Sequence, residues 1–288
     1  MRGCPQERKR CMNAFVQPLY QLADFEEINR QVKKPGIVQV SGCIDSQKAH
    51  FANGVGCGFS FRLILAENDL KAREFYEDYR MYDPETFLYP SRDLIFYQAD
   101  IHGNLITRER LRVIRALMER NRATVVASID GCMDCLLPLS VLESSVLRFQ
   151  SDSPVDLEEV TRQLVELGYE RTPQVEVPGQ FSVRGGILDV FSLTEENPWR
   201  IELWGDEIDS IRSFDAESQR SIENLEEIVI YPATELVLDD EKRKKGLEAI
   251  KKEAQACQKK LREEMKTQEA ANIGRLVKEL EEQLTQTE

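Results

Sequence analysis

The sequence predicts an α/β protein in three parts: a parallel-sheet domain over residues 1–138, a small α+β domain over 139–232, and helices over 233–288. Short apolar runs alternate with helical patterns in the first part, which is typical of a parallel sheet with crossover helices. In the second part, apolar and polar residues alternate between turn residues, as in strands. The third part is charged, helical in pattern and free of proline.

The composition is that of a globular protein with an acidic surface. Hydrophobic residues make up 41% of the 288 residues, which is enough to build packed cores. The net charge of −13 repels phosphate backbones, so nucleic acid is not the expected partner. No apolar run approaches the ~20 residues that a membrane span needs, and the first residues lack the apolar core of a signal peptide. We therefore expect a cytoplasmic protein without a membrane partner.

The cysteines predict neither a disulfide framework nor a metal centre. Their number is odd and they are scattered along the chain: Cys4, Cys11, Cys43, Cys57, Cys132, Cys135 and Cys257. Cys132 and Cys135 form a C-x-x-C pair, but no second pair follows at metal-binding spacing. His50 and His102 are not placed to complete a zinc site. We expect reduced thiols, no metal and no cofactor, with an incidental pair favoured over redox use.

In the first domain, apolar runs predict the strands and amphipathic patterns predict the helices. The runs are "GIVQV" (36–40), "FSFRLILA" (59–66), "DLIFY" (93–97) and "ATVVASI" (123–129). The helical patterns cover residues 13–34, 69–81 and 105–119.

The stretch "SGCIDSQKAH" (41–50) follows the first apolar run and approaches the phosphate-binding pattern G-x-x-x-x-G-K-[ST]. Gly42 and Lys48 fit that pattern, whereas Gln47 replaces its second glycine and Ala49 replaces its hydroxyl residue. The glycine lets backbone N–H groups surround the phosphates and the hydroxyl binds magnesium, so both roles are lost. The sequence therefore predicts an inactive, degenerate phosphate loop.

Two readings of this loop remain open. No acidic pair follows an apolar strand to hold magnesium: Asp130 ends "TVVASID" but is followed by Gly131 and Cys132. An inherited turn between a strand and a helix is therefore favoured. The alternative is an ATP-binding enzyme domain in which Lys48 still holds nucleotide.

A basic stretch over residues 108–122 offers a third, weaker reading, direct binding of nucleic acid. Its arginines are Arg108, Arg110, Arg112, Arg115, Arg120 and Arg122. They are interleaved with the apolar residues Leu111, Ile114, Leu117 and Met118, which predict an ordinary buried helix face. A solvated helix surface is favoured over a phosphate-binding patch.

The second domain begins with period-two alternation at "DCLLPLSVLESSVLRFQ" (134–150) and continues with a helix. We expect Ser153 to cap that helix, Pro154 to lie in its first turn, Asp156 to occupy the capping-box position and Gly168 to end it. Its buried stripe is Leu157, Val160, Leu164 and Leu167.

Three strands follow the helix, and the last two form a predicted hairpin. The strands are "GILDVFSL" (186–193), "WRIELW" (199–204) and "EIDSIRSF" (207–214). Gly205 and Asp206 suit a two-residue turn. Alternation places Ile201, Leu203 and Ile208 on one face. It places Arg200, Glu202, Trp204, Glu207 and Asp209 on the other.

The third part carries an apolar stripe at helical spacing that requires a partner surface. Its members are Leu261, Met265, Ile273, Leu276, Val277, Leu280 and Leu284. We expect these helices to pack on the rest of the protein rather than form a free coiled coil, because few heptads persist. The chain ends on "QLTQTE" without a stop signal, so a fragment of a longer protein is expected.

Residues 180–235, "QFSVRGGILDVFSLTEENPWRIELWGDEIDSIRSFDAESQRSIENLEEIVIYPATE", closely resemble the N-terminal module of bacterial transcription-repair coupling factors. That module is itself similar to the excision-repair protein UvrB. The segments "DLIFYQADIHGNLITRERLRVIRAL" and "VVASIDGCMDCLLPLSVLE" resemble it as well, so the resemblance covers nearly the whole chain beyond about residue 15.

The resemblance implies a degenerate RecA-like domain 1a without ATPase activity, a domain 2 that binds the damage sensor UvrA, and truncated helical segments 1b. UvrB keeps an intact phosphate loop, so the degenerate loop favours the coupling factors. The full-length family protein is an ATP-dependent DNA translocase. Its motor and its contacts with RNA polymerase and DNA lie in downstream domains that are missing here.

The family's UvrA-binding residues fall on Arg184, Arg200 and Trp204. Phenylalanine is usual at the position of Trp204, which makes this contact the least secure of the three. Arginine and tryptophan are enriched at binding hot spots, which favours docking. The alternative is structural: Trp204 packs under a helix, and the arginines pair with Glu202, Glu207 or Asp209. We expect a non-catalytic module that recruits UvrA in transcription-coupled nucleotide excision repair.

Overall fold

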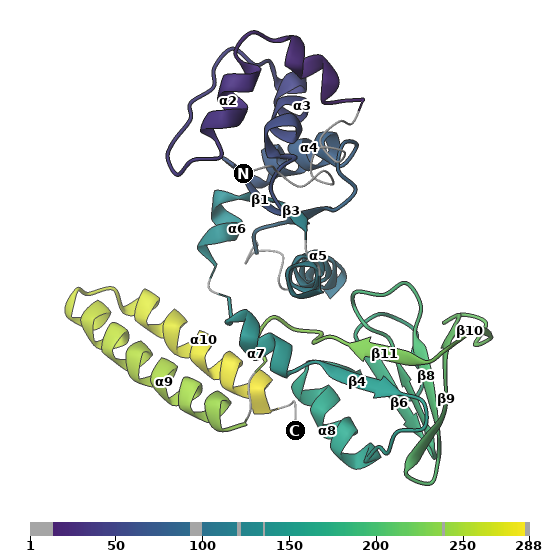
Figure 1. Cartoon of the computed structure of the whole chain (residues 1–288). Helices are drawn as coiled ribbons and strands as arrows, with labels where there is room; N and C mark the ends of the chain where they lie inside the picture. Colours follow the sequence, from purple (N-terminus) through teal and green to yellow (C-terminus); the bar gives the residue numbers. More distant parts are fainter. Residues whose placement is uncertain (1–13, 93–99, 120–121, 135, 238–239, 286–288) are drawn as a thin grey trace. The chain divides into compact units, whose positions relative to one another are not determined.

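The computed structural model describes residues 14–92, 100–119, 122–134, 136–237 and 240–285 (Figure 1). The chain forms two compact units, Met1–Ser144 and Ser145–Glu288. Each unit is described separately below.

Unit 1 contains a three-stranded sheet and its covering helices. The strands are β1 (Phe61–Ala66), β2 (Thr86–Tyr89) and β3 (Ala123–Ser128). The helices are the 3-10 helix η1 (Gln17–Gln21), α2 (Phe25–Gln31), α3 (Asp45–Gly56), α4 (Asp69–Tyr79), α5 (Asp100–Glu119), α6 (Ile129–Met133) and α7 (Leu139–Ser144).

The sheet has the order β1-β3-β2, and both of its strand pairs are parallel. The central strand β3 is buried along its whole length, as expected for a parallel sheet between helices. On one face, Val126 and Leu88 pack against Ala72 of α4. On the other face, Val125 packs against Val113 of α5. The predicted α/β class with a parallel sheet is thus confirmed.

The strand β1 is an edge of this sheet and is only partly covered. Phe61, Leu63 and Leu65 lie on one face of β1 and are exposed, whereas the alternate residues are half-buried. The sequence of β1 is apolar except for Arg62, so it carries little of the charge that usually protects an edge strand.

Several predicted elements of unit 1 differ in the structure. The helical pattern predicted within residues 13–34 corresponds to α2, which the 3-10 helix η1 precedes. The run "GIVQV" is not a strand: residues 37–44 have no regular structure, and Ile37 is 99% exposed. Pro35 and Gly36, the latter with a φ of 150°, precede this run, and no described strand pairs with it. The predicted strand "DLIFY" lies outside the described residues.

Unit 2 contains a β-rich domain followed by two helices. Its strands are β4 (Leu147–Gln150), β5 (Glu170–Arg171), β6 (Gln180–Arg184), β7 (Ile187–Val190), β8 (Trp199–Trp204), β9 (Glu207–Phe214), β10 (Ser221–Leu225) and β11 (Glu227–Ile230). Its helices are α8 (Leu157–Glu166), α9 (Asp240–Glu263) and α10 (Thr267–Thr285). The predicted small domain and C-terminal helices are confirmed.

Six strands of unit 2 form one sheet in the order β10-β9-β8-β7-β6-β5, and β4 pairs with β11 in a second. From β6 to β10, neighbouring strands are antiparallel. One face of the large sheet is apolar and buried, with Phe181, Leu188 and Ile201 fully inaccessible. The other face of the large sheet carries polar side chains, and the candidate functional site lies on this face.

The start of α8 differs from the prediction. Asp156 is the N-cap, and its carboxylate accepts hydrogen bonds from the backbone N–H groups of Glu158 and Glu159. Ser153 is not the cap, because its hydroxyl donates to the carbonyl oxygen of Gln150. The buried stripe is confirmed for Val160, Leu164 and Leu167, whereas Leu157 is half-buried.

The structure also differs from the prediction in the segment before α8. Part of the stretch with strand-like alternation, Leu139–Ser144, is the helix α7. Only Leu147–Gln150 of that stretch forms a strand, β4.

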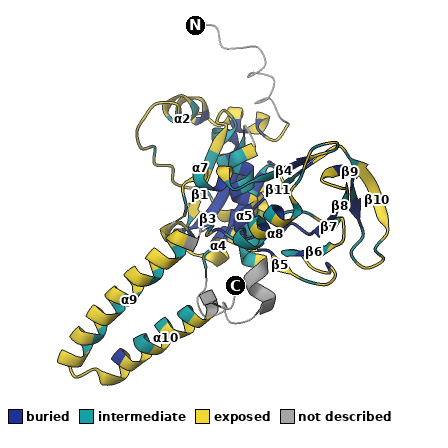
Figure 2. Cartoon of the chain, turned by 90° about the horizontal axis from the view of Figure 1, so that it is seen from below, coloured by how far each residue is buried: buried dark blue, intermediate teal, exposed yellow. Residues whose placement is uncertain are grey.

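The helices α9 and α10 pack on each other as an antiparallel hairpin (Figure 1). Residues alternating at spacings of three and four face the partner helix: Leu247, Lys251, Ala254, Gln258 and Leu261 on α9, and Ala270, Ile273, Val277 and Leu280 on α10. Figure 2 shows the rest of both helices to be mostly exposed. The coiled-coil-like seam was not expected.

The predicted apolar stripe of these helices needs two corrections. Met265 lies in the turn between the helices with a φ of 58°, and Leu276 is exposed, so neither belongs to the seam. The side chain of Leu284 lies outside the described part of the chain. Polar contacts fix the register of the hairpin: Lys251 pairs with Glu281, and Gln258 Nε2 donates to the carbonyl oxygen of Ala270 at 3.0 Å.

Candidate functional site

The degenerate phosphate loop leads into α3, and its only cation is already paired. Lys48 Nζ donates to Asp45 Oδ1 at 2.7 Å, and this hydrogen bond lowers the pKa of Asp45. Asp45 is the first residue of α3, so a carboxylate lies where a phosphate would approach the helix N-terminus. Gln47 lies in the first turn of α3, and Ala49 is buried in the next. The loop cation is therefore neutralised by a carboxylate of the same helix.

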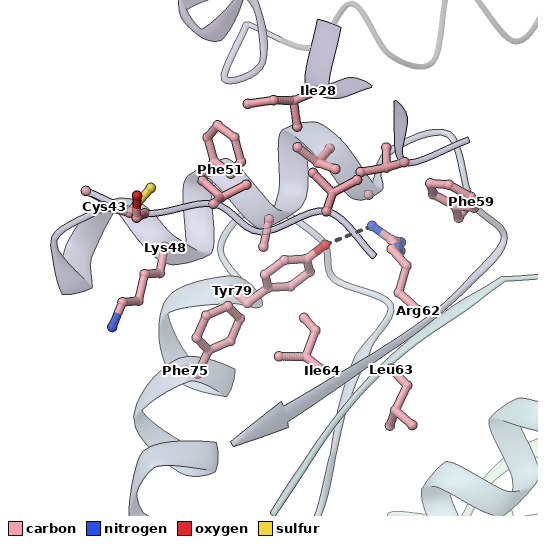
Figure 3. Close-up of a pocket in the computed structure, with 18 of the residues that line it drawn as sticks. Ile28, Cys43, Lys48, Phe51, Phe59, Arg62, Leu63, Ile64, Phe75 and Tyr79 are labelled. Carbon is pink, nitrogen blue, oxygen red and sulfur yellow. Dashed lines mark hydrogen bonds between the residues drawn. The ribbon is translucent and has the colours of Figure 1, made fainter. Parts of the chain in front are cut away.

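A cavity of about 820 Å³ lies beside this loop, between residues 38–43, α3 and β1 (Figure 3). Its lining is largely apolar and aromatic, with Phe51, Phe59 and Phe75 among the lining residues. Arg62 also lines it, but its guanidinium donates to the hydroxyl of Tyr79 at 3.0 Å and pairs with buried Asp83. Such a lining suits apolar groups rather than a nucleotide's phosphates.

The carboxyl ends of the parallel strands are occupied by the chain's own carboxylate. In open α/β sheets this edge is the usual ligand site. Here Asp69 accepts hydrogen bonds from the Ser128 hydroxyl at 2.5 Å and from the Ser91 backbone N–H at 3.2 Å. Burial opposes ionisation of Asp69, but the hydrogen bonds from Ser128 and Ser91 lower its pKa overall. This edge is thus closed by an anion and two hydroxyl residues.

The polar face of the large sheet in unit 2 brings two predicted site residues together. Arg184 ends β6, Arg200 lies in β8, and both reach Asp189 on the strand between them, β7. Arg184 Nη2 lies 2.7 Å from Asp189 Oδ2. Arg200 Nε lies 2.7 Å from Asp189 Oδ1, and its Nη2 lies 2.8 Å from Oδ2. Only 1% of the Asp189 side chain is exposed.

The two arginines differ in how much of them remains accessible. The side chain of Arg184 is 46% exposed, whereas that of Arg200 is 16% exposed. Arg200 also donates from Nη2 to Gln219 Oε1 at 3.0 Å, and its guanidinium lies 4.4 Å from the ring centroid of Phe214. The hydrogen bond to Asp189 raises the pKa of Arg200, which therefore stays charged.

Trp204 ends β8 on the same face and is 84% exposed. The predicted two-residue turn follows it, with Gly205 at a φ of 65°. A second glycine turn lies beside it, because Leu203 N–H donates to the carbonyl oxygen of Gly186 at 2.8 Å. A Cβ on Gly186 would lie 3.0 Å from the Leu203 oxygen, so a larger residue would crowd this approach and the neighbouring backbone would have to shift. Both hairpin turns thus meet at the end of the sheet that carries Trp204.

The contacts of Arg184, Arg200 and Trp204 differ from those that the structural alternative predicts. Trp204 is not packed under a helix, and both arginines pair with Asp189 instead of Glu202, Glu207 or Asp209. Glu202 pairs with Arg212 of β9.

The hairpin faces were predicted correctly except at one bulge. Leu203 pairs with Ile208 but Glu202 pairs with Ser210, so Asp209 is the extra residue.

Sequence reasoning assigned no role to Asp189, which joins the two arginines. The signal available was its place two residues before Phe191 in the "GGILDVF" motif, where an acid interrupts an otherwise apolar strand. A charged residue in such a run calls for a charged partner on the neighbouring strands.

The basic stretch on α5 does not present its arginines as one patch. Arg110 is fully buried and pairs with Asp134, Arg115 pairs with Glu119, and Arg122 pairs with Asp83. Arg120 lies outside the described residues. Leu111 and Ile114 are buried as predicted, which supports an ordinary packed helix.

The described residues contain no cluster of side chains that suits a metal ion. Cys43, Cys57, Cys132 and Cys257 are in the thiol form, without a disulfide, and burial raises the pKa of Cys132. Cys135 of the C-x-x-C pair lies outside the described residues. Across the described helices, none is both long enough and apolar enough to span a membrane.

Comparison with known proteins defines the class first. Residues 147–236, which include β4 to β11, match the family model described as the UvrB interaction domain. The chain therefore contains a domain of this class.

Relatives that match more than two thirds of the chain are DNA-repair proteins. The chain is 37% identical to the transcription-repair-coupling factor of Bacillus subtilis over 201 residues, which are 69% of the chain and 17% of the relative. It is 32% identical to UvrABC system protein B of Fervidobacterium nodosum over 213 residues, which are 74% of the chain and 32% of the relative. It is 31% identical to the coupling factor of Staphylococcus aureus strain Mu50 over 220 residues, covering 75% of the chain and 19% of the relative.

The chain is homologous to the N-terminal region of the transcription-repair-coupling factors and to UvrB, as the sequence resemblance indicated. It spans between 17% and 32% of the length of these three relatives.

Proposed function

We propose that the chain is a non-catalytic module that recruits UvrA in transcription-coupled nucleotide excision repair. UvrA docks on the polar end of the large sheet in unit 2, through Arg184, Arg200 and Trp204, which we call the docking face. The observation that carries this proposal is the exposure of Trp204 on the face where the two arginines share Asp189. A large exposed aromatic beside arginines is the usual composition of a binding hot spot.

The docking face is ordered before a partner arrives. Arg200 is held by hydrogen bonds to Asp189 and Gln219, and the glycine turns fix the strand ends. Side chains that are already immobilised lose less conformational entropy on binding. This preorganisation supports a protein-docking role over a catalytic one.

Unit 1 supports a role without nucleotide chemistry. The loop cation Lys48 is paired with Asp45, and Asp69 occupies the ligand edge of the sheet. Within the proposal, the parts 1–138, 139–232 and 233–288 correspond to domain 1a, the UvrA-binding domain 2 and a truncated 1b. Contacts with RNA polymerase and DNA belong to other parts of the full-length protein, which acts in the cytoplasm.

A binding titration against UvrA of the same organism tests the proposal. Arg184→Ala, Arg200→Ala and Trp204→Ala should each weaken binding by about tenfold or more, as expected for hot-spot residues. The matched control is Arg162→Ala, because Arg162 is an exposed arginine of the same unit, paired with Glu159 on α8. Unchanged affinity in all three docking-face variants would overturn the proposal, provided that circular dichroism shows them folded.

A further inference from the structure

We propose that Asp189 is a positioning residue of the docking face. Its carboxylate holds the guanidinium groups of Arg184 and Arg200 so that their remaining N–H groups bind a carboxylate of the partner protein. This inference rests on the proposed function, because it names the chemistry that the docking face recognises.

The strand register explains why one acid can hold both arginines. Asp189 lies directly opposite Arg200 on β8 and opposite Ser182 on β6, and Arg184 is two residues beyond Ser182. Side chains of opposed and diagonal residues on one sheet face are within reach of each other. Asp189 Oδ1 accepts from Arg200, and Oδ2 accepts from both arginines. Both oxygens of the carboxylate therefore accept hydrogen bonds from the residues that it orients.

Each guanidinium keeps donors that no described residue of the chain uses. Among the described residues, Asp189 is the contact of Arg184, through Nη2, which leaves Nε and Nη1 for a partner. Arg200 uses Nε and Nη2, which leaves Nη1. Two guanidinium groups around one carboxylate carry a net charge of +1, in a chain whose net charge is −13. An acidic group of the partner fits this local positive centre.

A protein carboxylate fits this centre better than a nucleic-acid phosphate. The overall negative charge of the chain repels a polyanion, whereas a single acidic side chain experiences mainly the local field. Arg184 Nη2 has a second N–H beside the one that it donates to Asp189, so the partly exposed Arg184 can still form a two-pronged contact with a planar carboxylate. Trp204 on the same face supplies the apolar contact area that protein interfaces use.

The first experiment is a double-mutant cycle on UvrA affinity. Asp189→Asn keeps the shape of the side chain but replaces one acceptor oxygen with a donor, which turns one arginine away. We expect affinity to fall by about tenfold, within the range of coupling between residues of one hydrogen-bond network. In an Arg184→Ala background, the same substitution should have a smaller effect, because one of the groups that it orients is gone. Equal effects in both backgrounds would overturn the positioning role.

Controls separate this inference from the proposed function. Glu159→Gln removes the carboxylate that holds Arg162 on α8 and should leave affinity unchanged. If Arg184→Ala and Arg200→Ala leave affinity unchanged, the proposed docking face is wrong. If they weaken binding but folded Asp189→Asn does not, only the role of Asp189 is wrong.

A second measurement needs no substitution of Asp189, so it tests the positioning role of Asp189 even if the Asp189→Asn variant does not fold. The protein is labelled with 15N-arginine, and the Nε–H signals are assigned with Arg→Lys variants. The Arg200 Nε–H signal should exchange slowly with water, because it donates to buried Asp189. Addition of UvrA should shift the Arg184 Nε–H signal. Fast exchange at Arg200, or an unmoved Arg184 signal in the complex, would overturn the inference.

A duplex DNA titration distinguishes a phosphate from a protein carboxylate. We expect no saturable binding that depends on Arg184. DNA binding that is lost in Arg184→Ala and falls steeply with salt would assign the site to phosphate and overturn the inference.

Discussion

Asp83 shows what a single buried acid does for unit 1. Its side chain is only 3% exposed and accepts a hydrogen bond from Thr124 Oγ1 at 2.9 Å. It also forms ion pairs with Arg62 and with Arg122, whose Nη2 lies 3.0 Å from Asp83 Oδ2. Arg62 is itself almost inaccessible, so its charge depends on this acid. A buried pair of this kind is costly to break, because the remaining charge has no partner.

Asp83→Ala should therefore destabilise the protein by about 3 kcal/mol or more. Urea unfolding followed by circular dichroism measures the loss. Asp78→Ala is the matched control, because Asp78 is exposed on α4, and it should change stability by less than about 0.5 kcal/mol. Similar losses in the two variants would contradict the role of Asp83.

We expect no nucleotide binding at Lys48. Because Asp45 neutralises Lys48 and Ala49 provides no hydroxyl, labelled ATP with magnesium should show no saturable binding. Lys48→Ala should leave the titration curve unchanged. Saturable binding that Lys48→Ala removes would restore the nucleotide-binding alternative.

At the scale of single elements, α8 depends on the cap that the structure assigns. Asp156→Ala should lower stability by about 1 kcal/mol, because two backbone N–H groups at the helix start lose their acceptor. Ser153→Ala should have a smaller effect, since its hydroxyl bonds to the Gln150 carbonyl outside the helix. Thermal unfolding of the two variants compares them directly. A larger loss at Ser153 would return the cap to that residue.

The hairpin of α9 and α10 depends on the residues of its seam. Ala270 is buried in the seam and the neighbouring Ala271 is exposed. Ala270→Asp should open the hairpin, because a carboxylate would be buried without a partner, while Ala271→Asp should not. Hydrogen exchange of the α9 and α10 amides, measured by mass spectrometry on the full chain, should accelerate only in Ala270→Asp. Equal exchange in both variants would refute the assigned seam.

The elements show where sequence reasoning succeeds and where it does not. The strands β1 and β3 were predictable because they are largely apolar runs between helices, whereas "TFLY" in β2 is too short to stand out. The run "GIVQV" has the same composition as a strand, but composition does not reveal that no described strand pairs with it. Local pattern is therefore a weaker guide to strands than to helices, because pairing is a tertiary property.

The candidate site, too, was predictable from local pattern only in part. The turn at Gly205 and the alternation along β8 placed Arg200 and Trp204 on one face from the sequence alone. The family resemblance was needed to add Arg184. The meeting of Arg184 and Arg200 at Asp189 depends on the register of three strands, which no local pattern contains.

At the scale of the whole molecule, the division into two units predicts separable behaviour. Residues 145–288 form one compact unit that contains the whole UvrB interaction domain and the docking face. Expressed alone, this segment should bind UvrA with an affinity within about threefold of the full chain, because it contains the whole docking face. A change of this size is well below the roughly 1.4 kcal/mol that corresponds to a tenfold change in affinity. Residues 1–144 should not bind it. Loss of binding by a folded 145–288 segment would show that unit 1 contributes to the interface.

The open side of β1 has a consequence for handling the protein. No described strand pairs with the outer edge of β1, and Phe61, Leu63 and Leu65 are exposed, so this edge can recruit the same strand from another molecule. Concentrated samples should become turbid, because molecules associate through this edge of the sheet. In unit 2 the edge strand β10 is bulged and partly charged, so it is a poorer template for such association. The shelf life of the purified chain is thus set by unit 1, far in sequence from the residues proposed to dock UvrA.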